Sequence, residues 1–260
     1  MKLLPLLALF GVMSAALPAA ANPRPFPFTY HYATSPEGAL EVEQFVDYVP
    51  VRVSREGLDG TEAVSSARLD LQTELELGLT EHLEAGFYFV FRQAAGATVQ
   101  PLNFKGIKQR LRYRFAEAGD WPIDTGVYFE LGQFHDELEV EEKLLLEKRV
   151  GAWRFATNLW LEHEYLFQVP EWKHIYNPTL AVGYELSPAV ALGAEYWMHG
   201  QLGKRFATSD HFLGPTARLS KGEYWLTAGL YTKVDALDVA PAVDSQRGRM
   251  WVRLLLGVGL

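Results

Sequence analysis

The chain has 260 residues, no cysteine and a formal net charge of −8 at pH 7, from 24 basic and 32 acidic residues. This acidic balance argues against nucleic acid as a partner, and no disulfide can hold the fold. The mean hydropathy of −0.05 is too low for a bundle of membrane-spanning helices. It suits a membrane barrel, in which only alternate residues meet lipid.

Residues 1–21 have the organisation of a signal peptide. Lys2 supplies a short positive region, and residues 3–12 are apolar. Ala19 and Ala21 fit the small-residue pattern of a signal-peptidase site, so we expect cleavage after Ala21. The alternative is a membrane anchor helix, but two prolines interrupt the stretch and no polar flank stops its transfer.

Alternation with a period of two runs through most of the remaining chain. Between Leu69 and Leu79, five leucines fall on one face, and Asp70 and two glutamates fall on the other. A helix would scatter these leucines around its circumference, whereas a strand separates the two sets. The same rule gives twelve segments: 39–52, 65–79, 83–94, 103–116, 123–134, 138–149, 152–166, 175–186, 190–200, 210–220, 223–233 and 247–260.

The length of these segments distinguishes a membrane fold from a soluble one. Most hold more than the five or six residues of an average soluble strand, and a tilted strand needs about 9–11 residues to cross a bilayer. The sequence therefore predicts an all-β fold: a transmembrane antiparallel up-and-down β-barrel of about 12 strands over residues 39–260.

The connections alternate between short and long, as expected for a barrel with short periplasmic turns and long outer loops. The short set is Thr80–His82, Glu117–Pro122, Val150–Gly151, Ser187–Ala189 and Lys221–Gly222. The long set is Ser54–Val64, Ala95–Leu102, Phe167–His174, Gln201–Ser209 and Val234–Gln246. The short connection His135–Glu137 falls on the long side and departs from the rule.

Aromatic residues gather near the ends of the predicted strands, which is typical of the two membrane interfaces. We expect one belt at the periplasmic ends and one toward the outer ends. These are, in that order, Phe115, Trp153, Tyr184 and Tyr224, then Tyr48, Tyr165, Tyr176 and Tyr196. The chain ends on an amphipathic strand, as outer-membrane proteins do, although its last residue is Leu260 rather than an aromatic one.

Residues 22–38 precede the first predicted strand. Phe26, Phe28, Tyr30 and Tyr32 alternate with polar residues and prolines. Proline cannot donate to a sheet, so the segment is predicted to be a periplasmic segment, a short edge strand or a plug in the lumen.

The stretch from Arg24 into the first predicted strand resembles the start of a group of bacterial outer-membrane barrels described as transporters or phenol-degradation-pathway barrels. The matching residues are Pro36, Gly38, Glu41 and Glu43. The resemblance implies an outer-membrane location and passage of a solute, and it carries over no functional residues.

The polar phase of the strands should face the lumen, and it contains the candidate site. Lys108, Arg110, Arg112 and Arg114 form a basic ladder on one face of a single strand. Like charges about 6–7 Å apart repel unless countered, so either a permeating anion or lumen carboxylates must lie opposite. The ladder is then a selectivity wall for anions or one side of a lumen sealed by salt bridges. The carboxylates predicted to line the lumen are Glu74, Glu76, Glu84, Glu130, Glu162 and Glu164.

No enzyme site is predicted. Asp210 and His211 are adjacent on a strand and should point to opposite faces, so they cannot act together simply. No metal-ligand spacing appears, and no cofactor is expected. Glu142 disagrees with the pattern because it lies in the lipid-facing phase; either it is near the outer rim or a bulge resets the phase.

These observations predict an outer-membrane channel or transport barrel for small solutes, with anions as the candidate class, surrounded by outer-membrane lipid. The first alternative is a sealed structural or adhesive barrel that acts through its outer loops. The second is a barrel hydrolase. The sequence leaves the solute, the openness of the lumen and the oligomeric state undecided.

Overall fold

The computed structural model describes residues 22–57, 60–203, 210–234 and 244–260, and the predicted signal peptide lies outside them. No helix in these residues is long and apolar enough to cross a bilayer. The strands are β1 (Leu40–Gly57), β2 (Gly60–Gly78), β3 (Leu83–Gln93), β4 (Leu102–Arg114), β5 (Asp124–Phe134), β6 (Glu137–Val150), β7 (Trp153–Leu166), β8 (Glu171–Tyr176), β9 (Thr179–Ser187), β10 (Val190–Leu202), β11 (Asp210–Lys221), β12 (Tyr224–Lys233) and β13 (Met250–Gly259).

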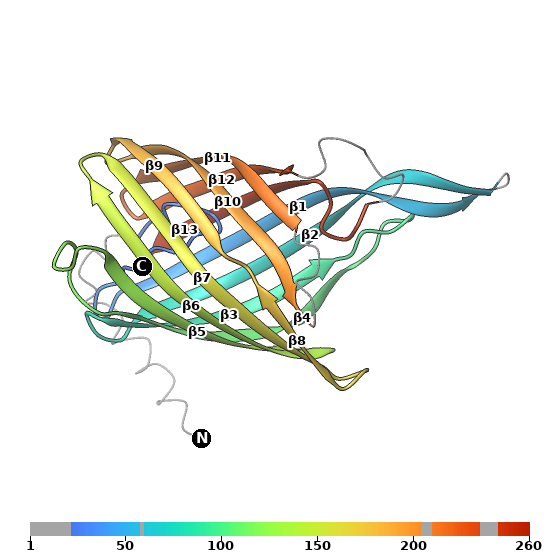
Figure 1. The fold of residues 1–260 in the computed structure, drawn as a ribbon, viewed down its shortest axis with the longest axis horizontal. Helices are drawn as coiled ribbons and strands as arrows, with labels where there is room; N and C mark the ends of the chain where they lie inside the picture. The colour runs from blue at the N-terminus through green and yellow to red at the C-terminus, as the bar shows by residue number, and fades with distance from the viewer. Residues whose placement is uncertain (1–21, 58–59, 204–209, 235–243) are drawn as a thin grey trace, which may run out of the picture.

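Neighbouring strands pair antiparallel around a closed barrel (Figure 1). β13 pairs with β1 from Glu41↔Gly259 to Tyr48↔Val252 and so closes the sheet. β8 and β9 both lie between β7 and β10 and together make one position in the wall. The barrel therefore has twelve positions, which confirms the predicted fold and strand number.

The interruption between β8 and β9 falls at Asn177 and Pro178, inside the predicted strand 175–186. Proline has no N–H to give to the ladder. Its carbonyl still accepts a hydrogen bond from the Met198 N–H at 3.2 Å, and the Asn177 N–H donates to the Trp160 carbonyl at 3.0 Å. The wall stays paired on both sides of the break.

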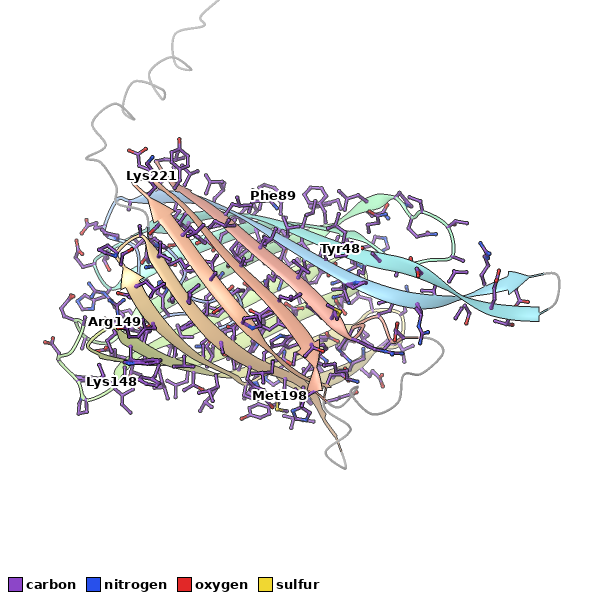
Figure 2. All side chains as sticks on the ribbon, turned by 90° about the horizontal axis from the view of Figure 1, so that it is seen from above. Tyr48, Phe89, Lys148, Arg149, Met198 and Lys221 are labelled. Atoms are coloured by element: carbon purple, nitrogen blue, oxygen red, sulfur yellow. The ribbon has the colours of Figure 1, made fainter. Side chains whose placement is uncertain are left out.

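The two faces of each strand differ as alternation predicts. On β2, Glu74 and Glu76 are buried, whereas Leu75 and Leu77 are 42% and 41% exposed. Tyr48 and Phe89 lie on the outer surface, and Lys148, Arg149 and Lys221 lie at the end opposite the β1–β2 hairpin (Figure 2). The polar phase thus faces the interior, and the apolar phase faces outward, where lipid would be.

The aromatic residues predicted to form two belts all lie on the outward phase, either exposed or half-buried. At the end with short turns, the rings of Trp153 and Tyr184 meet edge to face at 5.0 Å. The outward phase of β13 is apolar, from Met250 to Val258, as the sequence predicts.

The prediction of long loops at 54–64 and 167–174 was wrong, because strands extend into both segments. Most of 54–64 is strand, because β1 and β2 stay in register up to Gly57↔Gly60 and project beyond the rest of the barrel (Figure 1). Half of 167–174 is also strand, because β8 begins at Glu171 and pairs with β7. Cross-strand contacts such as that between the rings of Tyr165 and Trp172, with centroids 5.1 Å apart, extend the hairpin where sequence alone indicates polar turn residues. The predicted loops 201–209 and 234–246 lie partly outside the described residues.

Residues 22–38 run inside the barrel without forming a strand. The side chains of Phe26, Phe28, Tyr30 and Tyr32 are all 9% exposed or less. Phe28 stacks on Trp197 with ring centroids 4.6 Å apart and meets Tyr231 edge-on at 5.2 Å. A strand at this place would need a hydrogen-bonded neighbour, but the barrel is already closed around the segment.

Candidate functional site in the barrel lumen

At the centre of the basic ladder on β4, Arg110 and Arg112 form a cluster of ion pairs with glutamates on β2 and β3. The Arg110 guanidinium donates to Glu74 Oε1 at 2.6 Å and also to Glu76 and Glu84. Arg112 donates to Glu84 Oε2 at 2.7 Å. Both arginines are 3% exposed or less. Lumen carboxylates therefore occupy the positions that a permeating anion would need.

Lys108 forms a second cluster with β5 and β6. Its ammonium lies 2.8 Å from Glu130, 2.7 Å from Glu139 and 3.1 Å from Glu141. Lys143 adds a further ion pair to Glu141 at 2.6 Å. Pairing of the ladder with Glu84 and Glu130, one of the two sequence-based alternatives, is the arrangement observed.

The remaining predicted lumen residues, Arg114, Glu162 and Glu164, form their contacts with other partners, although Glu162 and Glu164 are directly opposite Glu141 and Glu139 in the strand register. Arg114 sits at the end with short turns and pairs with Glu117 at 2.5 Å. Glu162 accepts a hydrogen bond from Asn177 Nδ2 at 2.9 Å. Glu164 lies 3.5 Å from Lys173 near the other end. The ten predicted residues thus divide into two buried clusters and three residues with other partners.

Two wall residues that sequence reasoning left out of the site hold residues 22–38. Glu195 on β10 accepts hydrogen bonds from the N–H groups of Phe28, at 3.0 Å, and Thr29. Asn158 on β7 both accepts from the Tyr30 N–H at 2.7 Å and donates to the Tyr30 carbonyl at 2.9 Å. Both side chains are fully buried. Their inward phase was readable from the sequence, but their partners were not.

The two ends of the segment are also attached to the wall. Near its end, the Ser35 N–H donates to Glu84 Oε2 at 2.7 Å, and the Ser35 hydroxyl donates to Glu76 Oε1 at 2.5 Å. Near its start, Thr227 donates to the Arg24 carbonyl at 2.5 Å. The Ser35 contacts join the segment to the Arg110 cluster.

His31 is a buried titratable group of residues 22–38. It is 3% exposed, and its Nε2 lies 3.1 Å from Asn22 Nδ2. Burial lowers the pKa of His31 well below its usual 6.5, and the nearby charges of Arg112 and Arg154 lower it further. The imidazole is therefore neutral in this position at pH 7.

Cavities lie on both sides of the segment. On the side of the long loops, a cavity of about 450 Å³ is lined by five carboxylates, five basic side chains and several aromatic rings, including Phe28. On the side of the short turns, a cavity of about 270 Å³ is lined by Asn22, His31, Arg149, Arg154 and others. The balanced lining of the larger cavity does not favour one sign of solute charge.

Among the residues that the structure describes, three groups of carboxylates bring oxygens within 4.8 Å of one another, as a bound cation would require: Glu43/Glu74/Glu76, Glu130/Glu139/Glu141 and Glu137/Glu139/Glu164. Each already contacts basic side chains. Lys108 bridges the second group, Arg110 contacts the first, and Lys173 contacts the third. Ammonium and guanidinium groups therefore supply the positive charge in these places.

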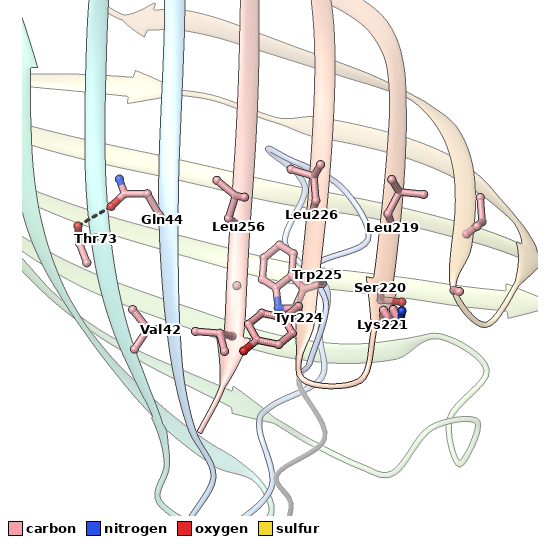
Figure 3. A pocket seen from close by; sticks show the side chains of 14 residues that line it. Val42, Gln44, Thr73, Leu219, Ser220, Lys221, Tyr224, Trp225, Leu226 and Leu256 are labelled. Carbon is pink, nitrogen blue, oxygen red and sulfur yellow. Dashed lines mark hydrogen bonds between the residues drawn. The ribbon is translucent and has the colours of Figure 1, made fainter.

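The outer surface carries an apolar groove of about 600 Å³ near the end with short turns (Figure 3). Leu219, Leu226, Leu256 and Val42 line it, and its polar contact is the hydrogen bond from Thr73 to Gln44 at 2.7 Å. The groove lies on the outward, apolar phase of the strands.

The strand register shows which way the adjacent residues Asp210 and His211 point. Asp210 pairs with Lys233 at 2.7 Å, whereas the neighbouring His211 faces outward and meets the Tyr196 hydroxyl at 2.7 Å. The two side chains therefore point to opposite faces of the wall.

The bulge predicted as one explanation for Glu142 was wrong. β6 runs without a register shift against β5 and β7, and the Glu142 side chain is 53% exposed on the outer face.

The fold is shared with solved outer-membrane barrels. The COG4313 outer membrane channel from Pseudomonas putida F1 superposes with a TM-score of 0.62 at 11% identity, over 88% of this chain and 98% of that one. The NanC porin superposes with a TM-score of 0.52 at 8% identity, over 85% and 99%. No family model and no curated protein matches the sequence. A closed antiparallel barrel with an apolar exterior and aromatic residues near its strand ends is the architecture of outer-membrane proteins.

Proposed function

We propose that the chain is an outer-membrane channel for small solutes, with residues 22–38 acting as a plug that narrows the lumen. The observation that carries the proposal is the pair of polar cavities separated by this segment, which contributes Phe28 to one and His31 to the other. A barrel that served only as a scaffold would need no polar space on both sides of a non-strand segment.

The names of the two solved structures support this reading, since one is called an outer membrane channel and the other a porin. The resemblance of the N-terminal stretch to transporter or phenol-degradation-pathway barrels belongs to the same proposal. Selectivity for anions receives less support, because each cation of the ladder has a carboxylate within 3.5 Å.

Conductance of the refolded barrel in a planar bilayer tests the proposal. The protein lacking residues 1–33 should conduct ions steadily, whereas the form beginning at Asn22 should conduct less. A heat-dependent shift in electrophoretic mobility shows that both forms are folded. If the shortened, folded barrel does not conduct, the channel proposal fails.

A sealed barrel with an adhesive role is the second candidate. It draws support from the β1–β2 hairpin, which extends past the rim and ends in polar and charged residues. A non-conducting shortened barrel, together with loss of surface attachment on removal of residues 53–64, would favour this function.

A further inference from the structure

The outer face of the barrel bears a polar group that the channel does not use. His163 on β7 and His174 on β8 are directly opposite each other in the antiparallel register. Their Nδ1 atoms are 2.7 Å apart, and their ring centroids are 4.9 Å apart. Glu142 on β6 places Oε2 4.0 Å from the other nitrogen of His163, Nε2. All three residues belong to the outward phase.

We propose that this group is a binding site for a divalent transition-metal ion such as Zn²⁺, with His163 and His174 as ligands and Glu142 as the group that orients His163. Imidazole nitrogens are preferred ligands of zinc, copper and nickel. Two nitrogens bound at about 2.0–2.1 Å to one ion lie roughly 2.9–3.4 Å apart in square-planar or tetrahedral geometry. The observed separation of 2.7 Å is therefore about 0.2 Å shorter than in a square-planar site and about 0.7 Å shorter than in a tetrahedral one, so the two rings must move apart slightly to chelate an ion.

The position of Glu142 fits this role. Metal-bound histidines commonly donate their second N–H to a carboxylate, which fixes the tautomer and increases ligand basicity. Here the Glu142 carboxylate lies 4.0 Å from Nε2, longer than a hydrogen bond, so the side chains must approach by about 1 Å for Nε2 to donate to it. Nδ1 of His163, which points toward His174, would then be the lone-pair nitrogen that binds the ion. The two remaining coordination positions of the ion would take water or a phosphate oxygen of an outer-leaflet lipid.

The apolar surroundings of Glu142 give a physical reason for a bound cation at this place. Val140, Leu144 and Leu161 occupy neighbouring outward positions, so a carboxylate among them is costly unless it is paired or near the rim. A bound dication offsets the charge of Glu142. It also ties β6, β7 and β8 together beside the place where the wall is interrupted, between β8 and β9.

The test is Zn²⁺ binding to the full mature barrel in detergent, produced without a polyhistidine tag and measured by competition with a chromophoric chelator. The wild type should bind one Zn²⁺, and His163→Ala or His174→Ala should each weaken binding by at least ten-fold. Glu142→Gln should weaken it roughly ten-fold, in line with other carboxylates that support metal-bound histidines. The matched control is His211→Ala, because His211 is also an outward-facing histidine and contacts Tyr196 instead.

Two outcomes overturn the proposal: a wild type that takes up no Zn²⁺, and a wild-type affinity that survives both histidine substitutions. Heat-modified mobility identifies any variant that fails to fold. In that event, the paramagnetic resonance spectrum of Cu²⁺ bound to the wild type decides, because the proposed site requires two nitrogen ligands. A spectrum with oxygen ligands alone contradicts the site.

Discussion

The two halves of the lumen wall are built differently. The β2–β6 half carries buried ion pairs between wall residues, such as Arg110 with Glu74 and Lys108 with Glu139. The β7–β12 half presents Asn158, Glu195 and Thr227, which hold residues 22–38 through hydrogen bonds, mostly to its backbone. One half therefore fills its share of the lumen mainly with its own side chains. The other half fills it with residues 22–38, which are not part of the sheet and are also held to the first half through Ser35.

The largest effect is expected when Arg110 is replaced, because it removes the central cation of the buried ion pairs in the β2–β6 half. In Arg110→Met, Glu74, Glu76 and Glu84 lose their shared cation, and removal of one partner of a buried ion pair costs about 3–5 kcal/mol. The temperature at which the barrel becomes heat-modified should fall markedly, while the reversal potential in a salt gradient should stay the same. Arg55→Met is the control, because Arg55 pairs with Glu62 on the exposed hairpin.

The opposite result would restore the anion-selectivity interpretation of the ladder. If Arg110→Met leaves the unfolding temperature unchanged and shifts the reversal potential toward cations, the guanidinium acts on permeating ions and not on the wall. Measurements at low salt make such a shift most visible, because screening is then weak.

The next largest effect is expected in the β7–β12 half, when the side chains that hold residues 22–38 are shortened. Glu195→Ala combined with Asn158→Ala removes the acceptors for the N–H groups of Phe28, Thr29 and Tyr30. The two hydrogen bonds to Glu195 contribute about 1.5–3 kcal/mol each and the two with Asn158 about 0.5–1.5 kcal/mol each, so the seated state should lose about 4 kcal/mol or more. Open events in single-channel records should become about 1,000-fold more frequent. The barrel should be destabilised less than in Arg110→Met, because among the described residues the wall loses only the hydrogen bond from Tyr231 to Glu195.

The control for this pair is Thr179→Val, which changes a buried inward residue on the same half of the wall. The Thr179 hydroxyl makes no hydrogen bond within the described residues. A conductance in the double variant equal to that of the wild type and of Thr179→Val would mean that residues 22–38 are held by their aromatic contacts alone.

A smaller effect should follow from pH through His31. Its pKa is lowered when the segment is seated, whereas a released segment should titrate near the ordinary value of 6.5. The seated state is therefore fully stable above pH 6.5 and loses stability as the pH falls below it, by at most about 1.4 kcal/mol per pH unit. Channel opening should increase between pH 6.5 and 5, and His31→Gln should remove that part of the increase.

Alternation in the sequence predicted the barrel, its number of strands and which side chains face the lumen. It could do so because period two is a local property of each strand and fixes the facing of every residue. The pairing of Lys108 with Glu130 was also within reach, because the two lie on neighbouring strands only 22 residues apart.

The contacts across the lumen could not be predicted in this way. Phe28 and Glu195 are 167 residues apart and meet only because the closed barrel encloses the segment. The ends of the β1–β2 and β7–β8 hairpins were misjudged for a related reason. Pairing between partner strands continues through polar residues such as Arg55 and Glu62, whose own pattern indicates a loop.

The smallest effect on barrel stability is expected at Arg114, the end of the basic ladder that lies near the short turns. Arg114 is on the same strand and face as Arg110, but its partner Glu117 is 59% exposed on a turn, and its Nε donates to the Glu81 carbonyl at 2.7 Å. The pKa of Glu117 is lowered by the hydrogen bond from Arg114, which shows that the pair interacts even in contact with water. An ion pair exposed to water is screened and contributes far less to stability than a buried one. Arg114→Met should therefore lower the heat-modification temperature far less than Arg110→Met. An equal loss in both variants would mean that charge along the strand, and not burial, determines how much each ladder cation stabilises the barrel.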